Sequence, residues 1–438
     1  MRVTRLKLSG FRAIEAAELR FQPRFNLIVG VNGVGKTSVL DALRICMSRI
    51  LPSITKSRAK AMSFSDDDIR IGLPFLDVEL SFDNGGHDFR FTRQQWTGKV
   101  ATDDIENIKK LRREILNSDR LRDRARTLLR DLNTPQQVTD NDTFVPSLAE
   151  LRKSADDQRV SANCIYFSTN RSVASNAGGS TSKTAGDIAV AYADALVPRP
   201  LHLAQFSRWM HVQEALSAER KLGRRHIEVL RSAVLRFLPD YKNLRPDPRE
   251  TSRLLIDHGK ITLEVSQLSD GERGVLALIL ELARRLSQAN PSLDDPLRNG
   301  EATVLIDEID LHLHPKWQRT IVGHLTNVFP RCQFIATTHS PQVVAAVEPE
   351  QVLLLVDGDV IHPDRSFGMD SNWILRHLMD VDERPASAAK VIKAIEALIT
   401  KGDFKKAFTA ITNARNKGLD LPEWSVLEAR ISRLERLR

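Results

Sequence analysis

The fold is decided by one stretch, NLIVGVNGVGKTSVL, which occupies residues 26–40. Its first residues form a short apolar run typical of a buried strand, and apolar residues recur at helical spacing from Lys36 to about Met47. Between them, residues 30–37 match the pattern G-x-x-x-x-G-K-[ST] of a phosphate-binding loop. This pattern requires a strand before it and a helix after it, and both are predicted here.

Each residue type in this loop has a physical role in holding phosphate. Glycines allow backbone N–H groups to converge on phosphate oxygens, and the helix N-terminus adds a partial positive charge. Lys36 supplies a charge to the β- and γ-phosphates, and Thr37 offers a hydroxyl to Mg²⁺. The loop therefore predicts a nucleoside triphosphate with Mg²⁺. The expected nucleotide contacts are Asn32, Gly33, Gly35, Lys36, Thr37 and Ser38.

An apolar strand over residues 302–306 ends in the two carboxylates Asp307 and Glu308. Asp307 is placed to hold Mg²⁺ through water, and Glu308 is placed to polarise the attacking water as a general base. The next predicted strand, 332–338, ends in Thr337-Thr338-His339-Ser340-Pro341. We expect its imidazole at the same edge of the sheet, so His339 is a second catalytic candidate.

A second special turn, LSDGER, covers residues 268–273 and precedes a strongly apolar helix. Ser269 and Gly271 at this helix N-terminus would form another anion-binding site. The alternative is an ordinary helix cap by Ser269 or Asp270.

Composition excludes several classes of protein. At 438 residues the chain is too long for one small domain, and no run of 18 apolar residues is present. The N-terminus resembles a strand rather than a secretory signal. Three distant cysteines fit a reducing compartment and no cysteine zinc site. We therefore expect a cytoplasmic protein without a membrane span. The net charge of +8 leaves nucleic-acid binding and an ordinary solvated surface equally open.

The pattern along the chain predicts an α/β fold in which a mixed sheet is covered by helices. Strands and helices alternate from residue 302 to 356, which favours parallel strands, and 74–82 with 88–96 predict a hairpin. The tail carries two amphipathic stretches separated at Lys401, which predict a helical hairpin. The expected parts are 1–98 (with the phosphate-binding loop), 99–260 (a largely helical insertion), 261–368 (with the second special turn, the acidic pair and His339) and 369–438 (a C-terminal helical region, a candidate for partner docking).

These motifs, in this order, resemble the P-loop heads of ABC-type ATPases in the RecF, SMC and overcoming-lysogenization-defect (OLD) group. The resemblance implies ATP held between two subunits of a homodimer or larger homo-oligomer, with Ser269, Gly271 and Glu272 acting on the neighbour's nucleotide. It also implies that Asp310 belongs to the D-loop and that His339 is the switch histidine. The cofactors implied are ATP and Mg²⁺.

Three positions bear on this resemblance less directly. Arg12 falls where such heads carry a nucleotide-side arginine. Asp270 replaces the usual first signature glycine, which makes transporter-type heads less fitting. The expected Q-loop glutamine is missing, and Asp66-Asp67-Asp68 stands near its place.

Three less specific motifs point to a smaller family within this group. The segments 166–171 (YFSTNR), 370–375 (DSNWIL) and 383–385 (ERP) look like the PtuA ATPases of Septu and retron-linked anti-phage systems, which act with an HNH endonuclease, PtuB. The chain is then an ATPase that regulates such a nuclease, with DNA as an expected partner. The alternative is a RecF-like repair ATPase that binds gapped or broken DNA. An SMC-like structural protein fits less well, because the insertion is short.

The sequence offers two candidate surfaces for DNA binding and does not decide between them. One candidate face holds Lys109, Lys110, Arg112 and Arg113, and another holds Arg220, Lys221, Arg224 and Arg225. For each of them, a solvated helix face is the favoured explanation over DNA binding. The tail hairpin, likewise, either docks the partner nuclease or covers the ATPase sheet.

Overall fold

The structure is a computed structural model that describes residues 1–73, 75–96, 142–158, 160–171, 188–217, 221–356, 358–381 and 385–436. The chain divides into two compact units, Met1–Asp370 and Ser371–Arg438. Some sequence-based expectations fall outside the described residues: the helical stretch 102–132 with its basic face at 109–113, the Gly/Ser/Thr-rich segment 175–186, Arg220, and Glu383 with Arg384.

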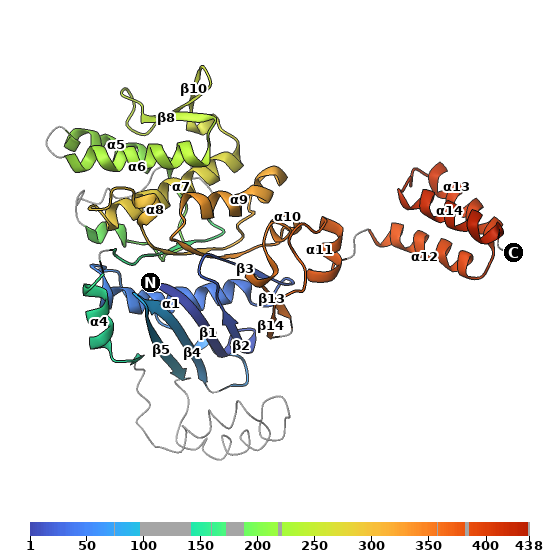
Figure 1. The fold of residues 1–438 in the computed structure, drawn as a ribbon, viewed down its shortest axis with the longest axis horizontal. Helices are drawn as coiled ribbons and strands as arrows, with labels where there is room; N and C mark the ends of the chain where they lie inside the picture. Colours follow the sequence, from blue (N-terminus) through green and yellow to red (C-terminus); the bar gives the residue numbers. More distant parts are fainter. Residues whose placement is uncertain are drawn as a thin grey trace, which may run out of the picture. The chain divides into compact units, whose positions relative to one another are not determined.

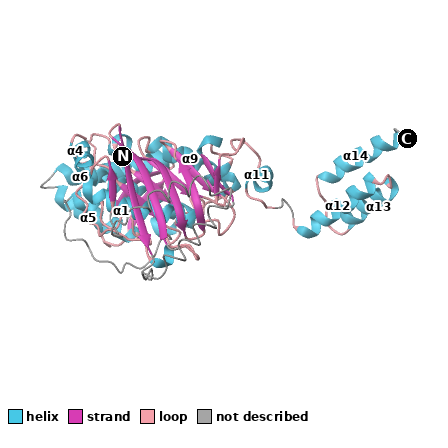
Figure 2. Ribbon diagram, turned by 90° about the horizontal axis from the view of Figure 1, so that it is seen from below, coloured by secondary structure: helices cyan, strands magenta, loops and turns pink. Residues whose placement is uncertain are grey.

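The first unit is built around a parallel sheet, drawn among the magenta strands of Figure 2. Its order is β14-β13-β3-β12-β11-β7, and only β14 runs antiparallel to its neighbour. The central strands are fully buried and mostly apolar, as expected for strands covered on both faces. This confirms the predicted parallel sheet. The strands are β3 (Phe25–Val29), β7 (Cys164–Phe167), β11 (Thr303–Ile306), β12 (Gln333–Thr337), β13 (Val352–Val356) and β14 (Asp359–Ile361).

A second, antiparallel sheet has the order β2-β1-β4-β5-β6. The predicted hairpin is present: β4 and β5 pair from Asn84 opposite His87, and Gly85 and Gly86 form the two-residue turn with φ of 68° and 85°. Positive φ at both turn positions is the reason for two glycines. The strands are β1 (Arg2–Phe11), β2 (Ile14–Arg20), β4 (Phe75–Asn84), β5 (His87–Trp96) and β6 (Thr143–Val145).

Helix α1 (Lys36–Ile54) packs between these two sheets. It is buried on nearly every side, and one core cluster joins its Leu43 and Met47 to Val78 of the antiparallel sheet and to Leu305 of the parallel sheet. The helix continues beyond the predicted end near Met47 because Ile50 and Leu51 are also buried in this core. The P-loop helix is therefore held rigidly by both layers.

The opposite face of the parallel sheet is covered by a layer of helices, shown in green to orange in Figure 1. The predicted helix 315–328 is confirmed as α9. Within the described part of the first unit, the α-helices besides α1 are α4 (Leu148–Asp156), α5 (Leu203–Ser217), α6 (Lys221–Phe237), α7 (Asp270–Ala289), α8 (Pro296–Asn299), α9 (Pro315–Val328) and α10 (Pro341–Val344). Of the helices that the structure describes, none is both long and apolar enough to cross a membrane.

The described part of 99–260 differs from the largely helical insertion that the sequence predicts. It contains α5 and α6, but β6 and β7 belong to the two main sheets. A further three-stranded sheet is formed by β8 (Tyr241–Pro246), β9 (Leu254–His258) and β10 (Ile261–Glu264). β7 joins the parallel sheet because its four apolar residues are all buried beside β11. This part of the chain thus completes the ATPase core.

The second unit has a hydrophobic core of its own. The predicted hairpin corresponds to α12 (Ala386–Thr400) and α13 (Phe404–Asn416), which follow α11 (Ser371–Leu378). A further helix, α14 (Glu423–Arg436), packs onto the hairpin and contributes the fully buried Trp424 to the same cluster. The tail is therefore a three-helix arrangement rather than a hairpin alone.

Candidate functional site

The predicted phosphate-binding loop lies between β3 and α1, as its sequence pattern requires. Gly33 and Gly35 have φ of 82° and 106°, a left-handed region that glycine adopts without strain. The Lys36 ammonium folds back over the loop and donates to the carbonyl oxygens of Gly30 at 2.8 Å and Val31 at 3.0 Å. These carbonyls hold the cation beside the place where phosphate groups bind.

Lys36 is buried and only 6% exposed. Burial lowers the pKa of its ammonium below the ordinary value, although the charges of Asp307 and Glu308 act in the opposite direction. A cation that has lost water and bonds only to carbonyl oxygens gains much from a bound anion. The geometry thus favours a phosphate ligand.

The acidic pair follows β11 and meets the P-loop through one hydroxyl. Thr37 Oγ1 lies 3.3 and 3.1 Å from the two carboxylate oxygens of Asp307, and it donates to this carboxylate. Thr337, at the end of β12, donates to Asp307 Oδ1 at 2.7 Å. The carboxyl ends of neighbouring parallel strands share one edge of the sheet, which brings these three residues together although they are distant in sequence.

Glu308 is half-buried, and its backbone φ is 50°. Its N–H donates to Thr337 Oγ1 at 2.7 Å, so the same threonine hydroxyl orients both acidic residues. Few non-glycine residues adopt this backbone conformation, and it is found most often where function requires it. In the sequence, the position of Thr337 at the end of a predicted strand is the only signal for this role.

Asp310 and the histidine stretch are also brought together. Thr338 is completely buried and donates to Asp310 Oδ1 at 2.6 Å, and the His339 N–H lies 3.4 Å from the same oxygen. The His339 side chain itself is exposed. Asp310 is thus tied by hydrogen bonds to the turn that holds His339, and the imidazole is left accessible.

Ser269, the predicted signature serine, is the N-cap of α7 and is exposed. It forms a capping box with Glu272: the Ser269 hydroxyl accepts from the Glu272 N–H at 3.3 Å, and the Ser269 N–H donates to the Glu272 carboxylate at 3.0 Å. Tyr241 donates to the other oxygen of this carboxylate at 2.8 Å. The helix-cap interpretation of this motif is therefore confirmed, and it leaves the serine at the surface, where a further ligand could reach it.

The signature glycine has a structural reason as well. A Cβ on Gly271 would lie 2.7 Å from the carbonyl oxygen of His312, so only glycine allows this close approach. The α7 N-terminus belongs to the helical layer on the far side of the parallel sheet from α1 (Figure 1). Within this chain, the signature and the P-loop therefore lie on different layers.

Arg12 and the triple aspartate are brought together. The Arg12 guanidinium donates to Asp41 of α1 at 2.7 Å and to Asp68 at 2.8 Å. Asp68 is buried, whereas Asp66 and Asp67 are exposed. Arg12 thus joins the first turns of α1 to the segment near the expected Q-loop.

The second basic face is used partly inside the fold. Arg225 donates to the carbonyl oxygens of Pro291 and Leu293, and Arg224 pairs with Glu228 at 3.1 Å. These contacts favour the ordinary helix-face explanation for this pair.

The chemistry of the donor set suits Mg²⁺. The Thr37 hydroxyl and the Asp307 carboxylate are hard oxygen ligands, which Mg²⁺ prefers, and they already converge. Elsewhere the cysteines give no metal site: Cys46, Cys164 and Cys332 are buried and free, and burial raises the pKa of each thiol. Across the described ranges no cluster of three or more His, Cys, Asp or Glu side chains could hold a metal ion alone.

Comparison with protein families finds one match that covers most of the chain. Residues 25–345 match the family described as "AAA domain, putative AbiEii toxin, Type IV TA system". The matched range includes the P-loop, the signature, the acidic pair and the histidine stretch.

Curated relatives include two retron ATPases. The chain is 39% identical to the retron Ec83 probable ATPase of Escherichia coli over 40% of this chain and 32% of that protein. It is 28% identical to the retron Vc95 probable ATPase of Vibrio cholerae serotype O1 biovar El Tor over 86% of this chain and 79% of that protein. The first match thus spans only about a third of the relative's length.

Two further similarities complete the comparison. The chain is 34% identical to the Septu protein PtuA of Bacillus thuringiensis over 26% of this chain and 31% of that protein. Among solved structures, an SMC head bound to the C-terminal winged-helix domain of ScpA aligns with 84% of this chain and 98% of that chain, at 15% identity and a TM-score of 0.46.

Proposed function

The chain belongs to the AAA-domain family described as putative AbiEii toxin of type IV toxin–antitoxin systems, and we propose that it binds and hydrolyses ATP as the ATPase of an anti-phage defence system. It is an ABC-type ATPase of the RecF, SMC and OLD group. The observation that carries the proposal is the contact of Thr37 with Asp307, which joins the phosphate-binding loop to the acidic pair.

Each residue of the site has a separate role in the proposed hydrolysis. Lys36 and the loop N–H groups bind the phosphates. Thr37 and Asp307 would hold Mg²⁺, which neutralises charge on the phosphate oxygens when bound. Glu308 accepts the proton of the water that attacks the γ-phosphorus, while the bond to the ADP oxygen breaks. Thr337 supports this step because it orients both acidic residues.

Binding and hydrolysis are tested separately. Lys36→Ala should lose ATP affinity itself, because it removes the cation that faces the phosphates. An equilibrium titration with a non-hydrolysable ATP analogue measures this directly. Unchanged affinity in the folded variant would refute the assignment of the P-loop.

We further propose that two subunits share each ATP. Ser269 is exposed at the start of α7, on a different layer from the P-loop, which fits a role on a neighbour's nucleotide. A mixture of Lys36→Ala subunits with Ser269→Arg subunits should regain activity, because one composite site in the mixed dimer consists of two wild-type halves. No regained activity at any mixing ratio of two folded variants would count against the shared site.

The partner in the proposed function is an HNH endonuclease of the PtuB kind. Two relatives are named retron ATPases and another is a Septu PtuA, which supports a defence system as the setting. The unit Ser371–Arg438 has its own core and lies outside all the ATPase motifs, which makes it the candidate docking region.

Deletion of residues 386–438 tests this docking role. The truncated chain should no longer co-purify with the nuclease encoded beside it, while its basal ATPase rate stays close to that of the full chain. Aggregation or loss of the ATPase rate would assign these helices to the ATPase core instead. If the nuclease still co-purifies, it docks outside residues 386–438.

A further inference from the structure

Arg171 contacts the backbone of the acidic pair, Asp307 and Glu308. It follows β7 in a turn where its N–H donates to the Ser168 carbonyl at 3.1 Å, and the residue is only 6% exposed. β7 pairs in parallel with β11, so that Phe167 lies opposite Ile306, the residue before Asp307. This register brings Arg171 to the acidic pair, although 136 residues separate it from Asp307.

The guanidinium donates hydrogen bonds to the backbone of both acidic residues. Its Nη1 donates to the Asp307 carbonyl oxygen and, at 3.3 Å, to that of Ser168, while its Nη2 donates to the Glu308 carbonyl oxygen. Because a guanidinium is planar and its N–H groups point in fixed directions, two successive carbonyls are held in one orientation. Glu308 sits in the left-handed region at φ 50°, and these hydrogen bonds support that conformation.

The charge of Arg171 is retained despite its burial. Burial lowers its pKa to about 10, while the carboxylates of Asp310, Asp307 and Glu308 act in the opposite direction. The group is therefore a cation at neutral pH. Within the described part of the chain, all its hydrogen bonds go to carbonyl oxygens, so the acidic side chains are not consumed by an ion pair with it.

We propose that Arg171 is a positioning residue for ATP hydrolysis, which holds the backbone at Asp307 and Glu308 so that their carboxylates face the P-loop. This inference rests on the proposed function. It predicts an effect on turnover rather than on nucleotide affinity, because Lys36 and the glycine loop supply the affinity and Arg171 touches neither. A small displacement of a general base lowers turnover strongly.

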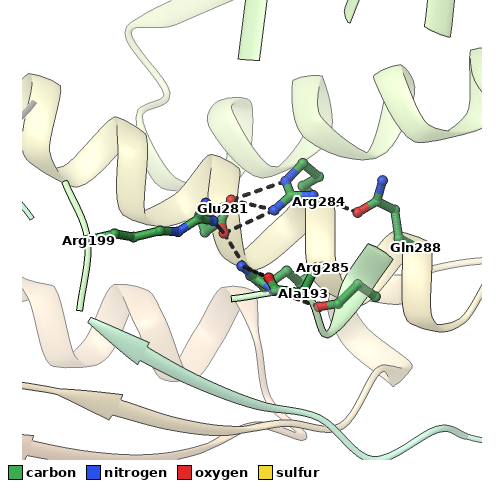
Figure 3. A network of polar contacts seen from close by, with 7 residues as sticks. Ala193, Arg199, Glu281, Arg284, Arg285 and Gln288 are labelled. Atoms are coloured by element: carbon green, nitrogen blue, oxygen red, sulfur yellow. Dashed lines mark hydrogen bonds and ion pairs between the residues drawn. The ribbon is translucent and has the colours of Figure 1, made fainter. Parts of the chain in front are cut away.

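Arg285 of α7 is a matched control in the same chain. It is completely buried and also donates to two carbonyl oxygens, those of Ala191 at 2.7 Å and Ala193 at 3.0 Å (Figure 3). Burial lowers its pKa to about 10 as well. It serves the fold, because its carbonyl partners are the last residue of η3 (Ile188–Ala191) and Ala193 just beyond it, rather than the acidic pair.

The test compares Arg171→Lys with Arg285→Lys for kcat, KM, ATP affinity and Tm. A lysine keeps the charge but has no planar fork. Arg171→Lys should lower kcat by at least about tenfold while ATP affinity stays within about threefold. Arg285→Lys should keep kcat within about twofold of wild type, even if its Tm falls as much as that of Arg171→Lys. Equal kcat in Arg171→Lys and wild type, or equal losses of kcat in both variants at equal Tm, would overturn the proposal.

A second variant keeps the test decisive if the lysine variant is unstable. Arg171→Ala should regain kcat when millimolar guanidinium chloride is added, and the same concentration of sodium chloride should give no such gain. No gain in a folded Arg171→Ala protein would contradict the positioning role.

Glu308→Gln separates this inference from the proposed function. If this variant hydrolyses ATP at the wild-type rate, the assignment of the acidic pair fails. If it is inactive while Arg171→Lys is fully active, only the role of Arg171 fails.

Discussion

Two buried arginines hold the backbone of this molecule in the same way, but the carboxylates beside them are used differently. The Arg285 guanidinium donates to two carbonyl oxygens, and its Nε also donates to Glu281 Oε1 at 2.7 Å (Figure 3). Arg171 binds the carbonyls of Asp307 and Glu308, but the Asp307 carboxylate accepts from Thr37 and Thr337 instead.

The difference shows how a charged cluster serves stability or function. Glu281 is surrounded by Arg199, Arg284 and Arg285, so its charge is satisfied within the fold. At the acidic pair, the Asp307 carboxylate contacts Thr37 of the P-loop, and among the described residues the Arg171 guanidinium donates only to backbone carbonyl oxygens. A functional site keeps its charged groups out of internal ion pairs, so that a ligand can use them.

The largest expected effect concerns Glu281. Glu281→Gln leaves three arginines without their buried counter-charge and should lower the free energy of unfolding by about 3–5 kcal/mol. We expect kcat to stay within about twofold of wild type, because among the described residues no hydrogen bond or ion pair joins Glu281 or its three arginines to the acidic pair. Denaturant unfolding and steady-state ATPase rates measure the two quantities.

An exposed ion pair provides the control for Glu281. Glu228 pairs with Arg224 at the surface, and Glu228→Gln should cost less than about 1 kcal/mol. Equal losses of stability in the two variants would mean that the buried cluster contributes nothing special.

The pH dependence of stability gives a second test of the Glu281 cluster. Burial raises the pKa of the Glu281 carboxyl, but the charges of Arg284, Arg285 and Arg199 outweigh it, so the pKa lies below its ordinary value of 4.5. A depressed carboxyl pKa adds stability above the unfolded pKa, and this stability is lost as pH falls toward the folded pKa. The gap in unfolding free energy between wild type and Glu281→Gln should narrow below about pH 4.5, by up to about 1.4 kcal/mol per pH unit. A gap that does not depend on pH would contradict the ion-pair account.

Thr337 tests the other region. Thr337→Val removes the hydroxyl that donates to Asp307 and accepts from the Glu308 N–H, and it leaves that N–H without its partner. We expect a loss of about 1–3 kcal/mol in stability and a fall in kcat of about tenfold. Thr337→Ser restores the hydroxyl and should recover most of both, as measured by the same two assays. A fully active Thr337→Val would show that the acidic pair is positioned without this hydroxyl.

The smallest effect on stability is expected at Lys36. Its ammonium is buried and, among the described residues, its hydrogen-bond partners are two carbonyl oxygens, so Lys36→Met should change the unfolding free energy of the ligand-free protein by less than about 1 kcal/mol. The same variant should abolish the rise in Tm that ATP gives to wild type. A large loss of stability without ligand would make Lys36 a structural residue.

The sequence predicts the parts of the site that are local in the chain. The P-loop, the strand that ends in Asp307 and Glu308, and the stretch that holds His339 were all found because each has a short motif beside a periodic element. The sequence also shows Glu281 within an apolar run flanked by arginines, but it does not show that they form one buried cluster.

The remaining features depend on contacts between distant segments. Arg171 reaches Asp307 only through the pairing of β7 with β11, and Tyr241 reaches Glu272 across 31 residues. The same reason explains why 99–260 was expected as a helical insertion: the place of β7 in the sheet depends on a partner strand far along the chain.

Single-turnover hydrolysis by Glu308→Gln tests the central claim most directly, namely that the P-loop and the acidic pair form one ATP-hydrolysing site. With enzyme in excess over ATP, the variant should bind ATP with wild-type affinity and cleave it at least about 10²-fold more slowly. ATP cleavage by this variant at the wild-type rate would contradict the claim.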